Sequence, residues 1–252
     1  MNSQAMAGEI LLLIDAGNSR VKWAWWNGTL GSQNSADWTE LSGGDFFPAD
    51  RKPDRIIIAN VGGQRIHEHI DTDAEEVVFV ETGKEAGGVT NAYRDPAQMG
   101  VDRWVAMIGA RHHRSGPLVV VDAGTALTVD MLDPDGMHLG GVIVPGYRLM
   151  LSSLLGGTAD IVEVTETVAD RVSDNNGIAA RSTDEAIHSG ALIALISLIR
   201  HGQEFLEKQS KTSPRILLCG GDADMLLPLL QNAEIVADLV LRGLAVISGK
   251  HP

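Results

Sequence analysis

The chain has 252 residues, of which 20 are lysine or arginine and 33 are aspartate or glutamate, so its formal net charge is −13. This acidic balance argues against nucleic acid as a partner, because a protein that follows a phosphate backbone needs a cationic face. Hydrophobic residues make up 44% and charged residues 21%, which is typical of a globular domain and excludes a disordered chain.

The cysteine content and the apolar runs indicate a compartment. The one cysteine, Cys219, cannot form an internal disulfide, which suits a reducing cytoplasm. The longest apolar runs are Ile10–Ile14 and Ala191–Ile199, far short of the roughly 20 residues that span a bilayer. Met1–Glu9 carries no positive charge before the first apolar run and does not resemble a secretory signal. We therefore expect a cytoplasmic protein with no membrane partner.

An apolar run that leads into Asp-Ala-Gly occurs twice. Leu11–Ser19 is matched by Leu118–Ala126, and each is followed by a second strand-like run, Val21–Trp26 and Leu127–Leu132. An apolar run bounded by glycine indicates a buried strand, and the short break before the next run favours a hairpin. Asp-Ala-Gly is also a common turn, but the shared strand, tripeptide and second strand together favour an internal duplication over chance.

The remaining elements follow in chain order. We predict strands over 55–61 and 76–81, a helix over 104–114, a strand over 136–144, helices from 147 to about 155 and over 183–200, a strand over 216–219 and a last helix over 238–248. Strands grouped before helices within each half favour mixed sheets rather than a regular βαβ series. We predict an α/β fold of two duplicated domains, 9–115 and 116–252, each a mixed sheet flanked by helices, with a cleft between them.

The two glycine turns suit a phosphate. Each places an aspartate at the end of a buried strand, followed by backbone amides that can close on an oxyanion, and glycine permits the close approach. Asn18 and Ser19 add donors in the first turn, and Lys22 on the next strand supplies a point charge. The sequence has no Gly-x4-Gly-Lys-Ser/Thr loop and no Gly-x-Gly-x-x-Gly at a strand–helix junction, which argues against P-loop and dinucleotide-binding folds.

Zinc hydrolase chemistry has no support, because His-Glu-x-x-His and cysteine pairs are absent. His67–His69 has the wrong spacing for one helical face, and His112 and His113 are adjacent. We interpret both groups as solvated helix ends rather than metal ligands.

Asp102 and Arg103 follow Gly100 at the predicted start of a helix. Asp102 can be an N-cap, worth about 1 kcal/mol, and Arg103 a surface charge. Alternatively Asp102 accepts a hydroxyl proton while Arg103 binds a substrate carboxylate, both on one rigid helix start.

Three further segments allow both a structural and a functional interpretation. Gly140–Gly146 is a strand between glycine pairs, either a sheet corner or the lining of a site. Ser182–Ala186 opens a long helix, with a hydroxyl that either caps the helix or faces the cleft. Cys219–Gly221 follows a buried strand and is either a simple turn or a stretch of backbone on which a planar ring of a ligand can lie. Cys219 itself is expected to be buried and inert.

In this order, the motifs resemble the type III pantothenate kinases, members of the superfamily of acetate kinases, sugar kinases, heat-shock chaperones and actin. The matching segments are Asp15–Lys22, Gly100–Arg103, Asp122–Asp130, Gly140–Gly146 and Thr183–Gly190. The resemblance implies two ribonuclease-H-like domains. It also implies transfer of the ATP γ-phosphate to the primary hydroxyl of pantothenate, giving 4′-phosphopantothenate in the first step of coenzyme A biosynthesis.

The resemblance also implies roles by position. Asp102 would be the general base. Pantothenate would be bound by Tyr93, Gly100, Val101, Asp102, Arg103 and Thr183, and ATP, carried with Mg²⁺, by Asp15, Ala16, Gly17, Asn18, Ser19, Arg20, Val21, Lys22 and Thr125. Asp122 would help to bind a monovalent cation, potassium or ammonium, and the chain would form a homodimer.

Two departures from the family pattern are visible: Ser19 stands where threonine is common, and Cys219 stands in place of a usual threonine near the adenosine. The second puts adenosine contacts in question but not phosphoryl transfer. Three rival functions stay open: another small-molecule kinase of the superfamily, a non-catalytic regulatory accessory protein, and an ATPase that uses its cleft as a conformational switch.

Overall fold

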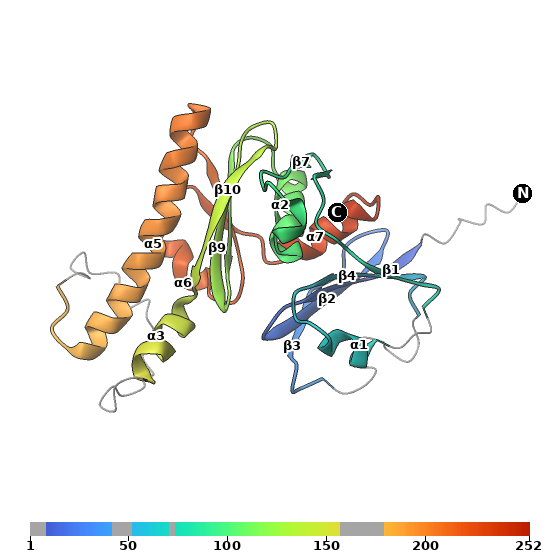
Figure 1. Cartoon of the computed structure of the whole chain (residues 1–252), viewed down its shortest axis with the longest axis horizontal. Helices are drawn as coiled ribbons and strands as arrows, with labels where there is room; N and C mark the ends of the chain where they lie inside the picture. The colour runs from blue at the N-terminus through green and yellow to red at the C-terminus, as the bar shows by residue number, and fades with distance from the viewer. Residues whose placement is uncertain (1–8, 42–51, 71–73, 157–178) are drawn as a thin grey trace, which may run out of the picture. The chain divides into compact units, whose positions relative to one another are not determined.

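The computed structural model describes residues 9–41, 52–70, 74–156 and 179–252 (Figure 1). Residues 1–8, on which the expectation of a missing secretory signal partly depends, lie outside them. The chain divides into two units, one of Met1–His113 with Asp238–Pro252 and the other of Arg114–Ala237. No helix among the described residues is both long and apolar enough to cross a membrane.

The sheet of the first unit is mixed. Its strand order is β3 (Asn34–Asp37), β2 (Arg20–Asn27), β1 (Ile10–Ala16), β4 (Arg55–Asn60) and β5 (Glu76–Phe79). β1 runs antiparallel to β2 and parallel to β4. Leu11–Ile14 of β1 and Ile56–Ile58 of β4 are almost completely buried on both faces, which explains their uninterrupted apolar sequence. Each such side chain contributes about 1.5–3 kcal/mol by burial.

Helices α2 (Val101–His113) and α7 (Leu239–Ile247) lie side by side in the first unit (Figure 1). Their backbones touch at two glycines. A Cβ on Gly109 would lie 2.1 Å from the Leu239 carbonyl oxygen, and a Cβ on Gly243 would lie 2.0 Å from the Val105 carbonyl oxygen. The crossing is therefore closer than any residue with a side chain would allow. The other elements of this unit are α1 (Arg65–His69), β6 (Glu85–Ala86), β7 (Val89–Thr90) and the 3-10 turn Pro96–Gln98.

The sheet of the second unit repeats the first strand for strand. Its order is β10 (His138–Pro145), β9 (Ala126–Leu132), β8 (Leu118–Ala123), β11 (Arg215–Cys219) and β12 (Ala233–Ile235). Here too the central strand β8 is antiparallel to the hairpin strand β9 and parallel to β11. The same order and directions around two matching Asp-Ala-Gly strands support the predicted duplication and the α/β fold with mixed sheets.

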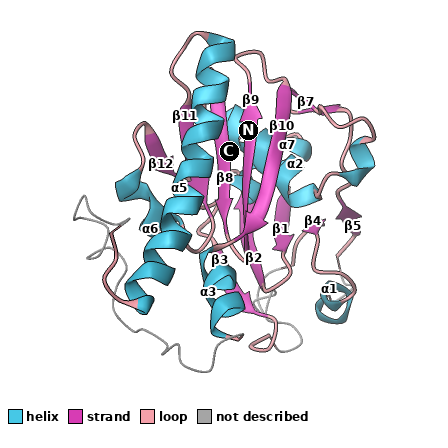
Figure 2. Cartoon of the chain, turned by 60° about the vertical axis from the view of Figure 1, so that its left-hand side comes forward, coloured by secondary structure: helices cyan, strands magenta, loops and turns pink. Residues whose placement is uncertain are grey.

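One face of the second sheet is covered by α5 (Thr183–Ser210), as Figure 2 shows. Leu192, Leu195 and Ile199 of α5 are buried in one cluster with the inward-facing residues of β8 and β9. The side chain of Ser182 accepts a hydrogen bond from the backbone N–H of Glu185 at 3.2 Å, so the predicted hydroxyl cap is Ser182. The shorter helices of this unit are α3 (Tyr147–Leu155), α6 (Ala223–Leu226) and the 3-10 turn Leu227–Leu229.

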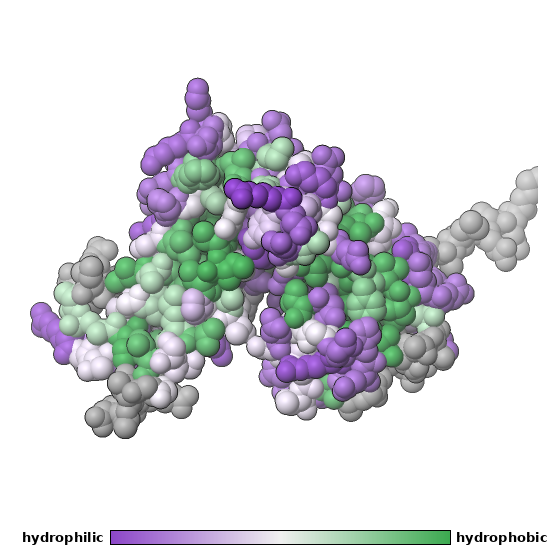
Figure 3. Space-filling view, viewed as in Figure 1, coloured by the Kyte–Doolittle hydropathy of each residue, from purple (hydrophilic) through white to green (hydrophobic). Residues whose placement is uncertain are grey.

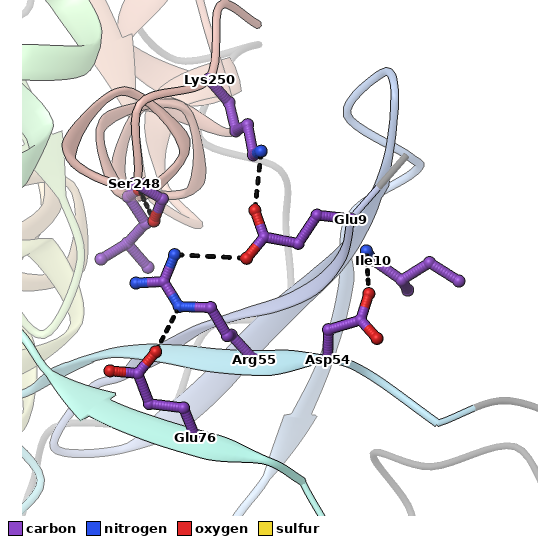
Figure 4. Close-up of polar contacts among 8 residues, drawn as sticks. Glu9, Ile10, Asp54, Arg55, Glu76, Ser248 and Lys250 are labelled. Carbon is purple, nitrogen blue, oxygen red and sulfur yellow. Dashed lines mark hydrogen bonds and ion pairs between the residues drawn. The ribbon is translucent and has the colours of Figure 1, made fainter. Parts of the chain in front are cut away.

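The last fifteen residues, Asp238–Pro252, belong to a different unit from the one predicted, since the predicted boundary assigned all residues from 116 onwards to the second domain. Asp238–Pro252 belongs to the first unit, since α7 packs on α2. A polar network adds to this association (Figure 4). Lys250 Nζ lies 2.7 Å from Glu9 Oε2, and Arg55 pairs with Glu9 at 3.4 Å and with Glu76 at 2.7 Å.

Candidate active site

The first glycine turn joins β1 to β2. The backbone N–H of Gly17 donates to the Arg20 carbonyl at 3.0 Å, and a Cβ on Gly17 would lie 2.9 Å from that oxygen. Asp15 is directly opposite Lys22 in the antiparallel pair, so the two side chains leave the strands on the same face of the sheet. Asn18 and Ser19 are exposed in the turn. The structure thus brings together the residues predicted to bind phosphate in this unit.

Three contacts that sequence reasoning missed hold this turn. The Trp38 indole N–H donates to the Gly17 carbonyl at 2.9 Å, Arg65 Nη1 donates to the Asn18 carbonyl at 3.1 Å, and the Gly62 N–H donates to the Ala16 carbonyl at 2.9 Å. Gly62 follows β4, which is parallel to β1, so both strands end at the same edge of the sheet. In the sequence, the only sign of this contact is the pair Gly62 and Gly63 directly after a buried strand. Arg65 also adds a cation beside the turn.

Several predicted ATP residues can act only through their backbone. The side chains of Ala16 and Val21 are completely buried in the core of the first unit. Arg20 projects outward and pairs with Asp37 on β3 at 3.1 Å. Lys22 is therefore the predicted point charge on this hairpin, together with the amides of the turn.

The second glycine turn joins β8 to β9 and is one residue tighter. The Gly124 N–H donates to the Ala126 carbonyl at 3.1 Å, and Thr125 is exposed. Two amides from other segments donate to this turn: the Asp222 N–H to the Ala123 carbonyl at 3.0 Å and the Gly146 N–H to the Thr125 carbonyl at 2.9 Å. The predicted glycine segments around Gly146 and Gly220 therefore support the turn that carries Thr125.

Gly220 packs directly against this turn. Its φ is +93°, and a Cβ would lie 2.4 Å from the Ala123 carbonyl oxygen and 2.5 Å from Asp122 Oδ1. Only glycine fits this conformation and this approach. The preceding residue, Cys219, is 2% exposed and paired in register with Asp122, as expected for a buried thiol.

Asp102 and Arg103 lie in the first turn of α2. Gly100, not Asp102, stands before the helix, because its carbonyl accepts the Trp104 N–H at 3.1 Å. Asp102 Oδ1 accepts the Arg103 backbone N–H at 2.8 Å, so the carboxylate still satisfies an amide of the helix start. A Cβ on Gly100 would lie 2.6 Å from Asp102 Oδ1, and glycine therefore makes room for the carboxylate.

Arg103 is not a surface charge. It is 6% exposed, its Nη1 donates to the Tyr93 hydroxyl at 2.8 Å, and its guanidinium carbon lies 5.8 Å from the centre of the Tyr93 ring. Val101 beside it is buried at 9% exposure. The structure thus gathers Tyr93, Gly100, Asp102 and Arg103 at one helix start, which is the set predicted for an acceptor substrate with a carboxylate.

Thr183, the remaining predicted acceptor residue, belongs to the second unit. It is the first residue of α5 and is exposed, directly after the capping Ser182. The predicted histidine groups occur at helix ends, His67 and His69 in α1 and His112 and His113 in the last turn of α2.

A model of the type III pantothenate kinases matches residues 11–203. The chain belongs to the type III pantothenate kinase family. Relatives that carry this family name include a protein of Nitrosococcus oceani, 34% identical over 95% of this chain and 94% of its own length. Another, from Laribacter hongkongensis, is 37% identical over 94% of this chain and 97% of its own length.

Solved structures agree with the fold. A Campylobacter jejuni protein named as a Baf family transcriptional activator gives a TM-score of 0.58 at 21% identity, covering 94% of this chain and 97% of that one. A 2-dehydro-3-deoxygalactonokinase structure from Sinorhizobium meliloti gives 0.53 at 15% identity, covering 96% and 98%. At these identities the likeness shows the fold alone.

Proposed function

We propose that this chain transfers the γ-phosphate of ATP to the primary hydroxyl of pantothenate, the first step towards coenzyme A. The observation that carries the proposal is the cluster at the start of α2, where Asp102 lies beside a buried Arg103 that is fixed by Tyr93. Pantothenate has a carboxylate at one end and the reacting hydroxyl at the other, so it needs one anchoring cation and one proton acceptor. The family membership of the chain supports the same acceptor.

On the acceptor side, Arg103 binds the carboxylate and Asp102 takes the hydroxyl proton. A guanidinium is planar and binds a carboxylate through two parallel N–H donors, and the Tyr93 hydroxyl fixes its orientation. The Arg103 backbone N–H holds Asp102 Oδ1 in place. A positioned base of this kind contributes roughly 10²–10⁴-fold to the rate. We also assign Thr183, the first residue of α5, to pantothenate binding.

On the nucleotide side, the residues position phosphates and neutralise charge, since phosphoryl transfer requires little covalent participation by the protein. Lys22 and the amides of Gly17, Asn18 and Ser19 bind phosphate oxygens in the first unit, and Thr125 does so in the second. ATP brings Mg²⁺ as part of the substrate. The hydroxyl oxygen of pantothenate forms a bond to the γ-phosphorus while the bond between that phosphorus and the β–γ bridging oxygen breaks. ADP leaves with the bridging oxygen, and Asp102 takes the hydroxyl proton.

We propose Asp122 as a ligand of the monovalent cation, potassium or ammonium. The donor chemistry fits, because the Asp122 carboxylate and the Ala123 carbonyl are oxygen donors packed against the same point of Gly220. When bound, such a cation supplies positive charge near the phosphates. Replacing potassium with sodium is therefore expected to lower the rate of ADP release.

We also propose that the chain acts as a homodimer. Apolar side chains are exposed on β10 and α3 of the second unit, including Val142, Ile143 and Leu154 at 41%, 58% and 50%, and Figure 3 shows this surface in green. Among the described residues β10 is the edge strand of its sheet, with no further strand on its outer side, and edge strands of this kind can pair with another chain. Light scattering of Ile143→Glu against wild type tests this, with a monomeric variant expected.

The acceptor is tested by measuring ADP release from ATP in potassium buffer with and without pantothenate. We expect release only with pantothenate, and phosphopantothenate as the second product. ADP release without any acceptor would favour a conformational ATPase. Turnover with another hydroxy compound in place of pantothenate would assign a different small-molecule kinase, and no turnover at all would favour the regulatory function.

A further inference from the structure

A cluster of a buried tyrosine, a buried histidine and a partly exposed aspartate connects α3 to the start of α5. The Tyr147 hydroxyl and His188 Nδ1 are hydrogen-bonded, and the two residues are 6% and 9% exposed. His188 Nε2 lies 3.4 Å from Asp184 Oδ1, one helical turn earlier on the same helix. Tyr147 and His188 lie in an otherwise apolar interface, where their polar atoms are costly to bury unless they are hydrogen-bonded, so their contact specifies how α3 sits on α5.

The two ends of this cluster are next to residues assigned to two different substrates. At one end Asp184 follows Thr183, the acceptor-side residue. At the other end Tyr147 follows Gly146, whose N–H donates to the Thr125 carbonyl at 2.9 Å in the second phosphate turn. A Cβ on Gly146 would lie 2.1 Å from the Gly124 carbonyl oxygen, so the start of α3 is pressed against that turn.

We propose that His188 is a positioning residue that couples the start of α5 to the second phosphate turn through Tyr147 and Gly146. The inference rests on the proposed function in assigning Thr183 to pantothenate and Thr125 to ATP. A shift of α3 relative to α5 displaces Thr125 and Thr183 with respect to each other. The cluster therefore keeps the two residues in one fixed arrangement within the second unit.

The first test is independent of activity. Tyr147→Phe removes one oxygen and keeps the ring, and hydrogen exchange of the Gly146 amide is compared with wild type. We expect exchange to rise about three- to tenfold, the size of one lost hydrogen bond. Ser153→Ala, a hydroxyl loss on the exposed side of the same helix, is the matched control and leaves Gly146 exchange unchanged. Unchanged exchange in Tyr147→Phe overturns the inference.

The second test separates positioning from stability. An asparagine at 188 places a polar atom near the position of Nδ1 and keeps the contact with Tyr147, whereas leucine removes it. We expect His188→Leu and Tyr147→Phe each to raise the KM for both ATP and pantothenate about three- to tenfold. The double variant should have KM values no higher than those of the single variants, because both changes remove the same contact. His188→Asn should have KM values close to those of wild type. Equal KM values in all variants contradict the coupling. If wild type lacks pantothenate-dependent turnover, the proposed function fails while the exchange result still decides whether the cluster holds the turn.

Discussion

Arg103 is the cation with the clearest assignment, because it is buried and held by Tyr93. Arg103→Ala is expected to raise the KM for pantothenate about 10- to 100-fold, the size of a lost hydrogen bond to a charged group, and to leave the KM for ATP nearly unchanged. Arg103→Lys keeps the charge but loses the planar fork and is expected to recover only part of the affinity. Steady-state kinetics with each substrate varied in turn measure both values. Weakened ATP binding with unchanged pantothenate binding would refute the assignment.

Gly220 and Gly221 form a matched pair. Gly220→Ala places a Cβ 2.4 Å from the Ala123 carbonyl oxygen at a φ of +93°, whereas a Cβ on Gly221 meets nothing within 4 Å. We expect Gly220→Ala to cost about 1–3 kcal/mol of stability and to raise the KM for ATP, because the second phosphate turn must shift. Gly221→Ala should change neither quantity by much. Urea denaturation and ATP kinetics compare the two variants, and equal behaviour would show that the contact is unimportant.

The α2–α7 crossing sets the position of the acceptor cluster within the first unit. Helix propensity alone favours alanine over glycine by about 1 kcal/mol, but a Cβ on Gly243 would lie 2.0 Å from the Val105 carbonyl oxygen. We therefore expect Gly243→Ala to lower the free energy of unfolding by about 1–3 kcal/mol or more, because backbone atoms must move.

Gly190 on α5 supplies the control for this variant. A Cβ there meets nothing within 4 Å, so Gly190→Ala should stabilise the helix by up to about 1 kcal/mol. Thermal or urea denaturation measures both changes. A stabilised Gly243→Ala variant would mean that the two helices can separate without loss.

At the scale of the whole molecule, an ion pair connects Glu9, which precedes β1, to Lys250, which follows α7. The pKa of Glu9 is lowered by the hydrogen bond from Lys250, against desolvation, with Arg55 adding to the effect. Because the Glu9 pKa is lower in the folded state, the ion pair stabilises the folded state fully at pH values above the unfolded pKa of 4.5. This stabilisation is lost as the pH falls through the lower folded pKa.

Glu9 and Lys250 are 32% and 24% exposed, so the pair contributes at most about 1 kcal/mol. Lys250→Met should lose that amount at pH 7 and show a smaller loss of stability on acidification than wild type. A double-mutant cycle with Glu9→Gln, measured by urea denaturation at pH 7 and pH 3.5, isolates the pair. A coupling energy that is the same at both pH values would contradict the assigned sign.

Local patterns predicted most of the elements and missed those that depend on long-range packing. The buried strands and the long helices are visible as apolar runs and caps, and the predicted helix over 183–200 is correct but continues to Ser210. The strands Asn34–Asp37 and Ala233–Ile235, of four and three residues, are too short to show an apolar pattern, and each pairs with the edge of a longer strand. The assignment of Asp238–Pro252 to the first unit depends on two glycines more than 100 residues apart, which no local pattern contains.

The same division holds at the candidate site. Glycine turns and an Asp-Arg pair indicated phosphate and carboxylate chemistry from their residue types alone. The contacts that support the turns could not be predicted from the sequence. Trp38, Arg65 and Asp222 are far from the turns in the sequence and contact them only in the folded chain. Tyr147 and His188 likewise meet only once α3 lies on α5.

The most direct test of the account is pantothenate-dependent ADP release by Asp102→Asn beside wild type, in potassium buffer at saturating substrates. Asparagine keeps the size of the side chain and an oxygen for the Arg103 N–H, so the variant should fold and bind ATP as wild type does. We predict strictly pantothenate-dependent turnover in wild type and a loss of roughly 10²–10⁴-fold in kcat for Asp102→Asn. Turnover in the variant within a few fold of wild type, or ADP release that does not require pantothenate, would contradict the account.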